Sequence, residues 1–156
     1  MAKEIERKFL VKSDKWKKGT LLKKVDIKQG YLSNTGGQQV RIRTMNNQAF
    51  ITIKSPRVGL TRQEYEYEIP IADGNKILEM SVTPLITKTR YYVYDDVKQM
   101  WEIDVYKGIN RGLVVAELEL ENEKQIITQP SWIGREVSKD RQYTNKYLTQ
   151  HKAPRV

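Results

Sequence analysis

Residues 4–11 read Glu-Ile-Glu-Arg-Lys-Phe-Leu-Val, and the order of polar and apolar side chains in them decides the fold. Glu4, Glu6 and Lys8 share one face of an extended chain, because residues two apart in a strand point the same way. Ile5 and Phe9 fall on the opposite face. This two-residue period predicts a β-strand with one charged face and one mostly apolar face.

The same alternation returns in six further segments of the chain. Their charged rows are Arg41 and Arg43 with Lys54; Arg62, Glu64, Glu66 and Glu68; Lys88 and Arg90; Glu102 and Asp104; and Glu117, Glu119 and Glu121. The pattern and the turn signals between segments predict strands at 4–11, 25–32, 40–45, 49–54, 61–71, 87–94, 100–106 and 113–121.

Three further segments are predicted to form short helices, at 72–81, 122–127 and 138–150. We therefore expect a mainly β (α+β) fold: one domain over residues 1–156, built as an eight-stranded antiparallel barrel, closed or nearly closed, with a few short covering helices.

Two architectures fit alternating charge: a charged face turned to water, or a barrel with its charged face inside. The rows are segregated by sign, which favours the second. Acidic rows attract divalent cations and basic rows attract polyanions, and Arg offers a two-pronged donor to phosphate oxygens. A lumen with both signs is suited to a metal-bound phosphate chain, because Mg²⁺ binds one or two carboxylates together with substrate phosphate oxygens.

Composition excludes several kinds of site. The chain has 156 residues, no Cys and a single His, His151, so thiolate metal sites and cysteine nucleophiles are excluded and His-based catalysis is disfavoured. The formal net charge of +9 favours an anionic partner. No run of about 18 apolar residues predicts a membrane span, and no apolar leader is visible, so we expect a cytoplasmic protein without a membrane partner.

The segment Glu4-Ile5-Glu6-Arg7-Lys8 resembles the ExExK signature of the CYTH superfamily, the triphosphate tunnel metalloenzymes, and of its bacterial short-chain members in particular. The resemblance extends along almost the whole chain. It includes Gln29-Gly30-Tyr31-Leu32, Val40-Arg41-Ile42-Arg43, Arg62-Gln63-Glu64-Tyr65-Glu66, Lys88-Thr89-Arg90-Tyr91, Trp101-Glu102-Ile103-Asp104-Val105, Glu117-Leu118-Glu119 and Asp140-Arg141-Gln142-Tyr143-Thr144-Asn145. It implies a charged tunnel in which a triphosphate is hydrolysed or cyclised with Mg²⁺ or Mn²⁺.

The resemblance also implies roles for individual residues. The metal ligands would be Glu4, Glu6, Glu117 and Glu119, and the phosphate-binding residues Lys8, Arg41, Arg43, Lys54, Arg62, Lys88 and Arg90. Glu64, Glu66 and Lys8 would take part in catalysis, the two glutamates by holding a second metal or orienting the attacking water. Glu102, Asp104 and Tyr31 are further candidates. The segment with Arg141, Tyr143, Asn145 and Lys146 resembles the one that closes an end of the tunnel in relatives.

Three functions stay open at this point. The first is hydrolysis of inorganic tripolyphosphate, which the lack of an insertion for an organic group favours. The second is an adenylate cyclase or a thiamine or nucleoside triphosphatase. The third is a non-catalytic module that binds polyphosphate or RNA, although binding alone does not need paired glutamates among arginines. Nucleic acid is disfavoured as a partner. The sequence leaves the oligomeric state open between a monomer and a homodimer.

Overall fold

The computed structural model describes residues 3–33 and 35–154. The strands are β1 (Lys3–Val11), β2 (Thr20–Ser33), β3 (Gln39–Met45), β4 (Gln48–Lys54), β5 (Thr61–Ile69), β6 (Ile86–Tyr94), β7 (Met100–Tyr106), β8 (Val114–Glu119) and β9 (Ile133–Glu136). The helices are α1 (Ile71–Leu78) and α2 (Asn145–Leu148), with 3₁₀ turns η1 (Asp14–Lys18), η2 (Gly108–Asn110) and η3 (Arg141–Tyr143). Among the described residues, no helix is long and apolar enough to cross a membrane.

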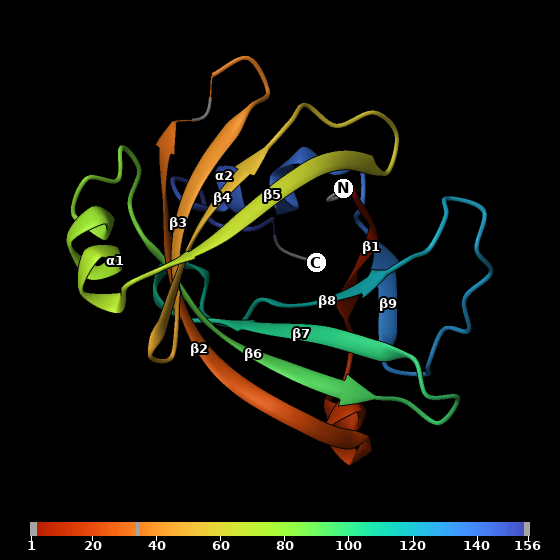
Figure 1. Cartoon of the computed structure of the whole chain (residues 1–156). Helices are drawn as coiled ribbons and strands as arrows, with labels where there is room; N and C mark the ends of the chain where they lie inside the picture. Colours follow the sequence, from red (N-terminus) through yellow and green to blue (C-terminus); the bar gives the residue numbers. More distant parts are fainter. Residues whose placement is uncertain (1–2, 34, 155–156) are drawn as a thin grey trace.

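Eight strands close into an antiparallel barrel, in the order β1-β5-β4-β3-β2-β6-β7-β8 and back to β1. The closing seam is short, because β1 meets β5 only at Lys3↔Gln63, Glu4↔Arg62 and Ile5↔Thr61. Figure 1 shows the strands curving round a common axis, with α1 outside them. The predicted eight-stranded antiparallel barrel is confirmed.

A ninth strand, β9, was not predicted. It pairs with the second half of β1, at Phe9↔Glu136 and Val11↔Ile133, on the edge that β5 has left. Its four residues are too few to show a two-residue period, so its pairing depends on the neighbouring edge rather than on its own pattern.

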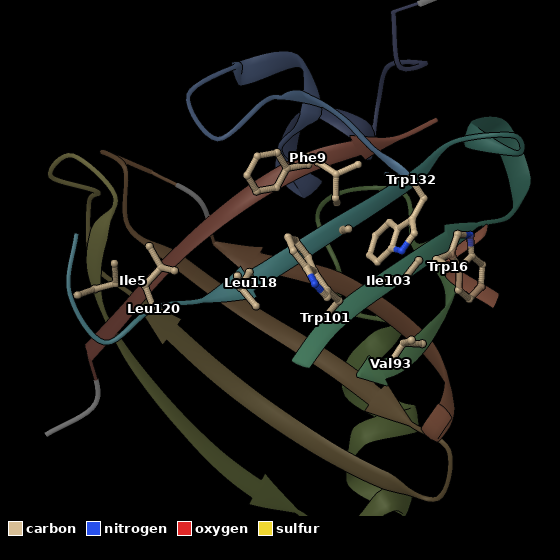
Figure 2. Packing of buried hydrophobic residues seen from close by; sticks show 11 residues of the cluster. Ile5, Phe9, Trp16, Val93, Trp101, Ile103, Leu118, Leu120 and Trp132 are labelled. Carbon is tan, nitrogen blue, oxygen red and sulfur yellow. The ribbon is translucent and has the colours of Figure 1, made fainter. Parts of the chain in front are cut away.

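The main apolar core lies outside the barrel wall, because the charged side chains occupy the inside. Phe9 packs edge-on against Trp101, with ring centroids 5.8 Å apart, and Trp101 packs against Trp132 at 5.4 Å. Figure 2 shows these rings together with Trp16 and the aliphatic side chains of the same cluster. Trp16 of η1 and Trp132 therefore cover the outer faces of β1, β6, β7 and β8.

A second apolar cluster closes one end of the barrel. Its members from the strands are Leu10, Ile86, Tyr106 and Val115, and its members from the C-terminal segment are Val137, Tyr143 and Leu148. Asn110 strengthens the junction, because its Nδ2 donates to the carbonyl of Leu148 at 3.0 Å. The C-terminal segment thus lies across the strand ends on apolar contacts.

Two helix predictions were wrong: one segment forms no helix, and the other forms two short turns. Residues 122–127 form no helix; the Glu123 carboxylate instead accepts from Leu60 N and from the Thr61 hydroxyl, and Asn122 Oδ1 accepts from Lys124 N. Polar side chains that bond to nearby backbone compete with helical hydrogen bonds.

The same competition divides the predicted helix at 138–150. Asp140 accepts from Gln142 N and begins η3, and Thr144 then accepts from Tyr147 N and begins α2. The result is two separate turns rather than one continuous helix. The helix predicted at 72–81 is present as α1, shifted by a few residues.

Candidate active site

One cavity inside the barrel, of about 310 Å³, gathers most of the charged rows. Its lining residues are Glu4, Glu6, Lys8, Tyr31, Gln39, Arg41, Arg43, Lys54, Arg57, Arg62, Glu64, Glu66, Arg90, Tyr92, Glu102, Glu117, Glu119, Thr144, Asn145 and Lys146. Tyr31 and Tyr92 are the only aromatic residues among them, and none is aliphatic. The charged faces of the strands therefore point inward.

The basic wall is built mainly on β3. The Nη2 atom of Arg41 donates to Thr52 Oγ1 at 3.3 Å, and that of Arg43 donates to Glu66 Oε2 at 3.2 Å. Burial, with Arg41 and Arg90 close by, lowers the pKa of Arg43 to about 10, so it remains a cation at neutral pH. The Nε–H groups of Arg41, Arg43 and Arg62 are buried without a hydrogen-bond acceptor among the described residues. Buried donors without partners point to a missing anionic ligand or water.

Lys54 of β4 lies between two carboxylates. Its Nζ is 3.2 Å from Glu4 Oε2 and 3.2 Å from Glu64 Oε2. Burial raises the pKa of Glu4, although Lys54 opposes that effect. In Glu64, burial would raise the pKa, but the hydrogen bond with Glu4 and the charge of Lys54 lower it. These two carboxyl groups therefore share a proton or a cation.

Glu6 and Glu117 form a second carboxyl pair, on β1 and β8. Burial and the charge of Glu117 raise the pKa of Glu6 well above its usual value. Burial alone would raise the pKa of Glu117 as well, but Lys8 and the hydrogen bond from Glu6 lower it. The proton of the pair thus resides on Glu6, and a divalent cation could replace it.

Glu119 adds a fifth carboxylate beside these pairs. Burial together with the charges of Glu4 and Glu102 raises the pKa of Glu119 to about 7. Glu119 therefore lies among like charges that a divalent cation could offset.

Lys88 and Asp104 lie behind the cavity wall and do not line it. Lys88 Nζ is 2.7 Å from Asp104 Oδ2, and both side chains are fully buried. Arg90 donates to the same carboxylate through Nε at 2.7 Å and Nη2 at 3.0 Å. Arg90 also reaches Glu102 at 2.6 Å, so Asp104 fixes an arginine that does face the cavity.

Comparison with known proteins identifies the family. The model of the CYTH domain matches residues 2–152. The chain belongs to the CYTH family. This CYTH chain is 42% identical over 153 residues to an inorganic triphosphatase of Acetivibrio thermocellus, covering 97% of the chain and 96% of the relative. It is 36% identical over 148 residues to an inorganic triphosphatase of Nitrosomonas europaea, covering 93% of the chain and 95% of the relative.

The likeness extends to three dimensions. A crystal structure of an inorganic triphosphatase superposes on this CYTH barrel with a TM-score of 0.69 at 35% identity, covering 95% of this chain and 98% of the other.

Most of the residues predicted for the site converge on the CYTH cavity, with Lys88 and Asp104 as the exceptions. The cavity also contains residues that the sequence prediction missed. Gln39 and Tyr92 each lie two positions from a predicted arginine on the same strand, so the alternation could have revealed them. Arg57 lies in the loop between β4 and β5, where no periodicity exists to indicate its direction.

The donor set of this CYTH cavity fits a divalent cation only in part. Among residues 3–33 and 35–154, no three acidic or His side chains converge in a geometry that would hold a metal ion alone. Carboxyl pairs do exist, at Glu6 with Glu117 and at Glu4 with Glu64. Mg²⁺ is usually held by one or two carboxylates and completes its shell with water and phosphate oxygens. The pairs therefore fit a metal whose coordination a bound phosphate chain completes.

Proposed function

We propose that this chain is a divalent-metal-dependent inorganic triphosphatase, which hydrolyses tripolyphosphate in the barrel cavity with Mg²⁺ or Mn²⁺. The observation that supports this proposal most is the joint occurrence of paired glutamates and buried arginines in one cavity of about 310 Å³. The two curated relatives described above are both inorganic triphosphatases, at 42% and 36% identity over nearly the full chain.

The basic residues would bind the phosphate oxygens. Arg41, Arg43 and Arg62 have buried Nε–H donors ready for an anion, and Lys8, Lys54 and Arg90 lie on the same lining. Arg41, Arg43, Lys54 and Arg90 are held by carboxylates before substrate arrives, so they need little reorganisation to stabilise the charge of the transferring phosphoryl group.

The acidic residues would hold the metal. Glu6 with Glu117 and Glu4 with Glu64 offer paired oxygens, and Glu119 lies beside them. When bound, a divalent metal offsets phosphate charge and lowers the pKa of a coordinated water. Glu64 and Glu66 are proposed to orient the attacking water, since both line the cavity and are held in place by Lys54 and Arg43. No protein nucleophile is needed for this reaction.

Tripolyphosphate is preferred over a nucleotide because the lining offers an organic group little apolar surface. Tyr31 and Tyr92 are its only aromatic residues, and Tyr31 is almost fully buried. A base or thiazole ring would have to remain outside the charged cavity or stack on Tyr92 alone.

Glu6→Ala tests the proposal against a module that only binds polyanions. We expect phosphate release from tripolyphosphate to fall by roughly 10²-fold or more, because the variant loses a metal-binding carboxylate. Removal of negative charge should leave tripolyphosphate binding intact or tighter when measured by calorimetry. Glu68→Ala is the matched control, since Glu68 lies on β5 outside the cavity lining. Full turnover in Glu6→Ala would contradict the metal assignment.

A further inference from the structure

Asn145 stands where the C-terminal segment meets the cavity. It is the first residue of α2, is half-buried, and lines the cavity together with Thr144 and Lys146. The preceding residues are fixed against the barrel, because Lys8 Nζ donates to the carbonyl of Tyr143 at 3.1 Å. The backbone of Asn145 is therefore held at the closed end of the cavity.

The side-chain oxygen of Asn145 faces two donors from the barrel. Tyr106 OH donates to Asn145 Oδ1 at 2.5 Å, and Lys88 Nζ donates to the same oxygen at 3.4 Å. An ammonium group has only donors, so the atom that faces Lys88 must be the oxygen of the amide and not its nitrogen. Burial lowers the pKa of Lys88 to about 8, which leaves it mainly cationic at neutral pH. The orientation of the amide is thus fixed by charge.

The amide nitrogen is then directed away from the barrel floor. Among the hydrogen bonds of residues 3–33 and 35–154, the Asn145 side chain takes part only through Oδ1, with Tyr106 and Lys88, and the residue borders a cavity rich in cations. Fixed N–H groups beside arginines and lysines are suited to an anionic oxygen. Three carboxylates of the cavity, Glu64, Glu66 and Glu102, are paired with Lys54, Arg43 and Arg90.

We propose that Nδ2 of Asn145 donates to an oxygen of the phosphate group at the closed end of the cavity, and that Lys88 and Tyr106 are positioning residues for it. This inference rests on the proposed function, because it takes a triphosphate as the ligand. It also gives Lys88 a different task from the phosphate contact that the family resemblance implies. Lys88 is fully buried behind the wall, so it acts through Asn145 and Asp104.

Asn145→Ala tests the donor directly. A hydrogen bond to a charged oxygen contributes enough that we expect KM for tripolyphosphate to rise by roughly tenfold to a hundredfold, with a much smaller change in kcat. Asn110→Asp is the matched control, because Asn110 also anchors the C-terminal segment, through Leu148, but does not line the cavity. We expect the control to lower the melting temperature and to leave KM within about twofold. An unchanged KM in Asn145→Ala, or an equal rise in the control, would overturn the inference.

Tyr106→Phe tests whether the Tyr106 hydroxyl orients the Asn145 amide or the ring only packs in the apolar cluster. It removes the donor to Asn145 Oδ1 and keeps the ring in the apolar cluster that closes the barrel. We expect Tyr106→Phe to raise KM in the wild-type background and to have no effect in the Asn145→Ala background, since the amide that it orients is then absent. An identical effect of Tyr106→Phe in both backgrounds would overturn the positioning role.

Affinity and turnover, measured separately, distinguish a missing Asn145 contact from a missing triphosphatase activity. Calorimetric titration with tripolyphosphate measures the contact without turnover, so a roughly tenfold loss of affinity in Asn145→Ala supports it even if wild-type protein releases no phosphate. An active wild-type protein with equal tripolyphosphate affinity in Asn145→Ala would overturn the inference and leave the proposed function in place.

Discussion

Carboxylates that repel one another lie in hydrogen-bonding pairs on the acidic side of this cavity. Burial and the charge of Glu117 raise the pKa of Glu6, while Glu4 and Glu64 have the Lys54 ammonium group between them. Buried like charges are unfavourable unless a proton or cation stands between them. Their presence in a folded protein therefore indicates a function that needs several oxygens in one place.

We expect the raised pKa of Glu119, about 7, to make metal binding depend on pH, because Glu119 is one of the proposed metal ligands. Below pH 7 the carboxyl is mainly protonated, and the proton must leave before a metal can bind. We expect the Mg²⁺ concentration for half-maximal phosphate release to fall as pH rises from about 6 to about 8, by up to roughly tenfold per pH unit for one proton.

Glu119→Gln should flatten this pH dependence, because the amide cannot titrate. Glu121→Gln serves as control, since Glu121 is exposed and lies outside the cavity lining. Equal pH profiles for wild type and Glu119→Gln would show that another group governs metal binding.

The sequence predicts which face of a strand a charged residue occupies, but it does not predict how far along the barrel axis that residue lies. The two-residue period fixes which side of a strand Lys88 occupies, and Lys88 does point inward. Its height along the barrel depends on strand tilt and on how far the C-terminal segment enters, and neither leaves a mark in the local sequence. Lys88 therefore lies under the cavity instead of on its surface.

Helix α1 packs against β3 and β4, and Gly74 lies where the helix closely approaches β4. Gly74 is buried in the helix, and its amide donates to the carbonyl of Pro70 at 3.0 Å. A Cβ atom added at Gly74 would stand well inside contact distance of Ala49 Cβ on β4. Close approach of the helix to the strand is thus the reason for a glycine within the helix.

In Gly74→Ala, the higher helix propensity of alanine and the tight contact with Ala49 have opposite effects on the free energy of unfolding. Propensity alone would stabilise the protein by about 0.5–1 kcal/mol, whereas overpacking a tight contact costs about 1–3 kcal/mol. We expect a net loss of about 1–2 kcal/mol in the free energy of unfolding, measured by urea denaturation. Ala49→Gly should recover part of that loss in the double variant. A more stable Gly74→Ala protein would contradict the close packing of α1.

The long strands were predictable because each repeats the two-residue alternation of polar and apolar side chains several times. The short helices and turns were not, because side-chain hydrogen bonds determine where they begin and end. The segment at 122–127 contains helix-forming residues, yet Glu123 bonds to Leu60 and Thr61 far away in the sequence. Partners at such distances cannot be read from a local window.

The main apolar core lies outside the barrel wall, and the alternating charged rows of the strands face inward. Trp101 and Trp132 belong to the outer core, while the inside holds a cavity whose lining is almost wholly polar. This arrangement was predictable from the segregation of charge signs between strands, since a solvated surface would mix them. The covering by η1 and by the segment before β9 was not, because it depends on contacts between distant parts of the chain.

Metal-dependent hydrolysis of tripolyphosphate is best tested by phosphate release, measured with Mg²⁺, with Mn²⁺ and with EDTA. ATP and thiamine triphosphate are run in parallel. We expect rapid release from tripolyphosphate that EDTA abolishes, with little turnover of either organic triphosphate. Release that persists in EDTA, or formation of cyclic nucleotide and pyrophosphate from ATP without hydrolysis of tripolyphosphate, would contradict this expectation.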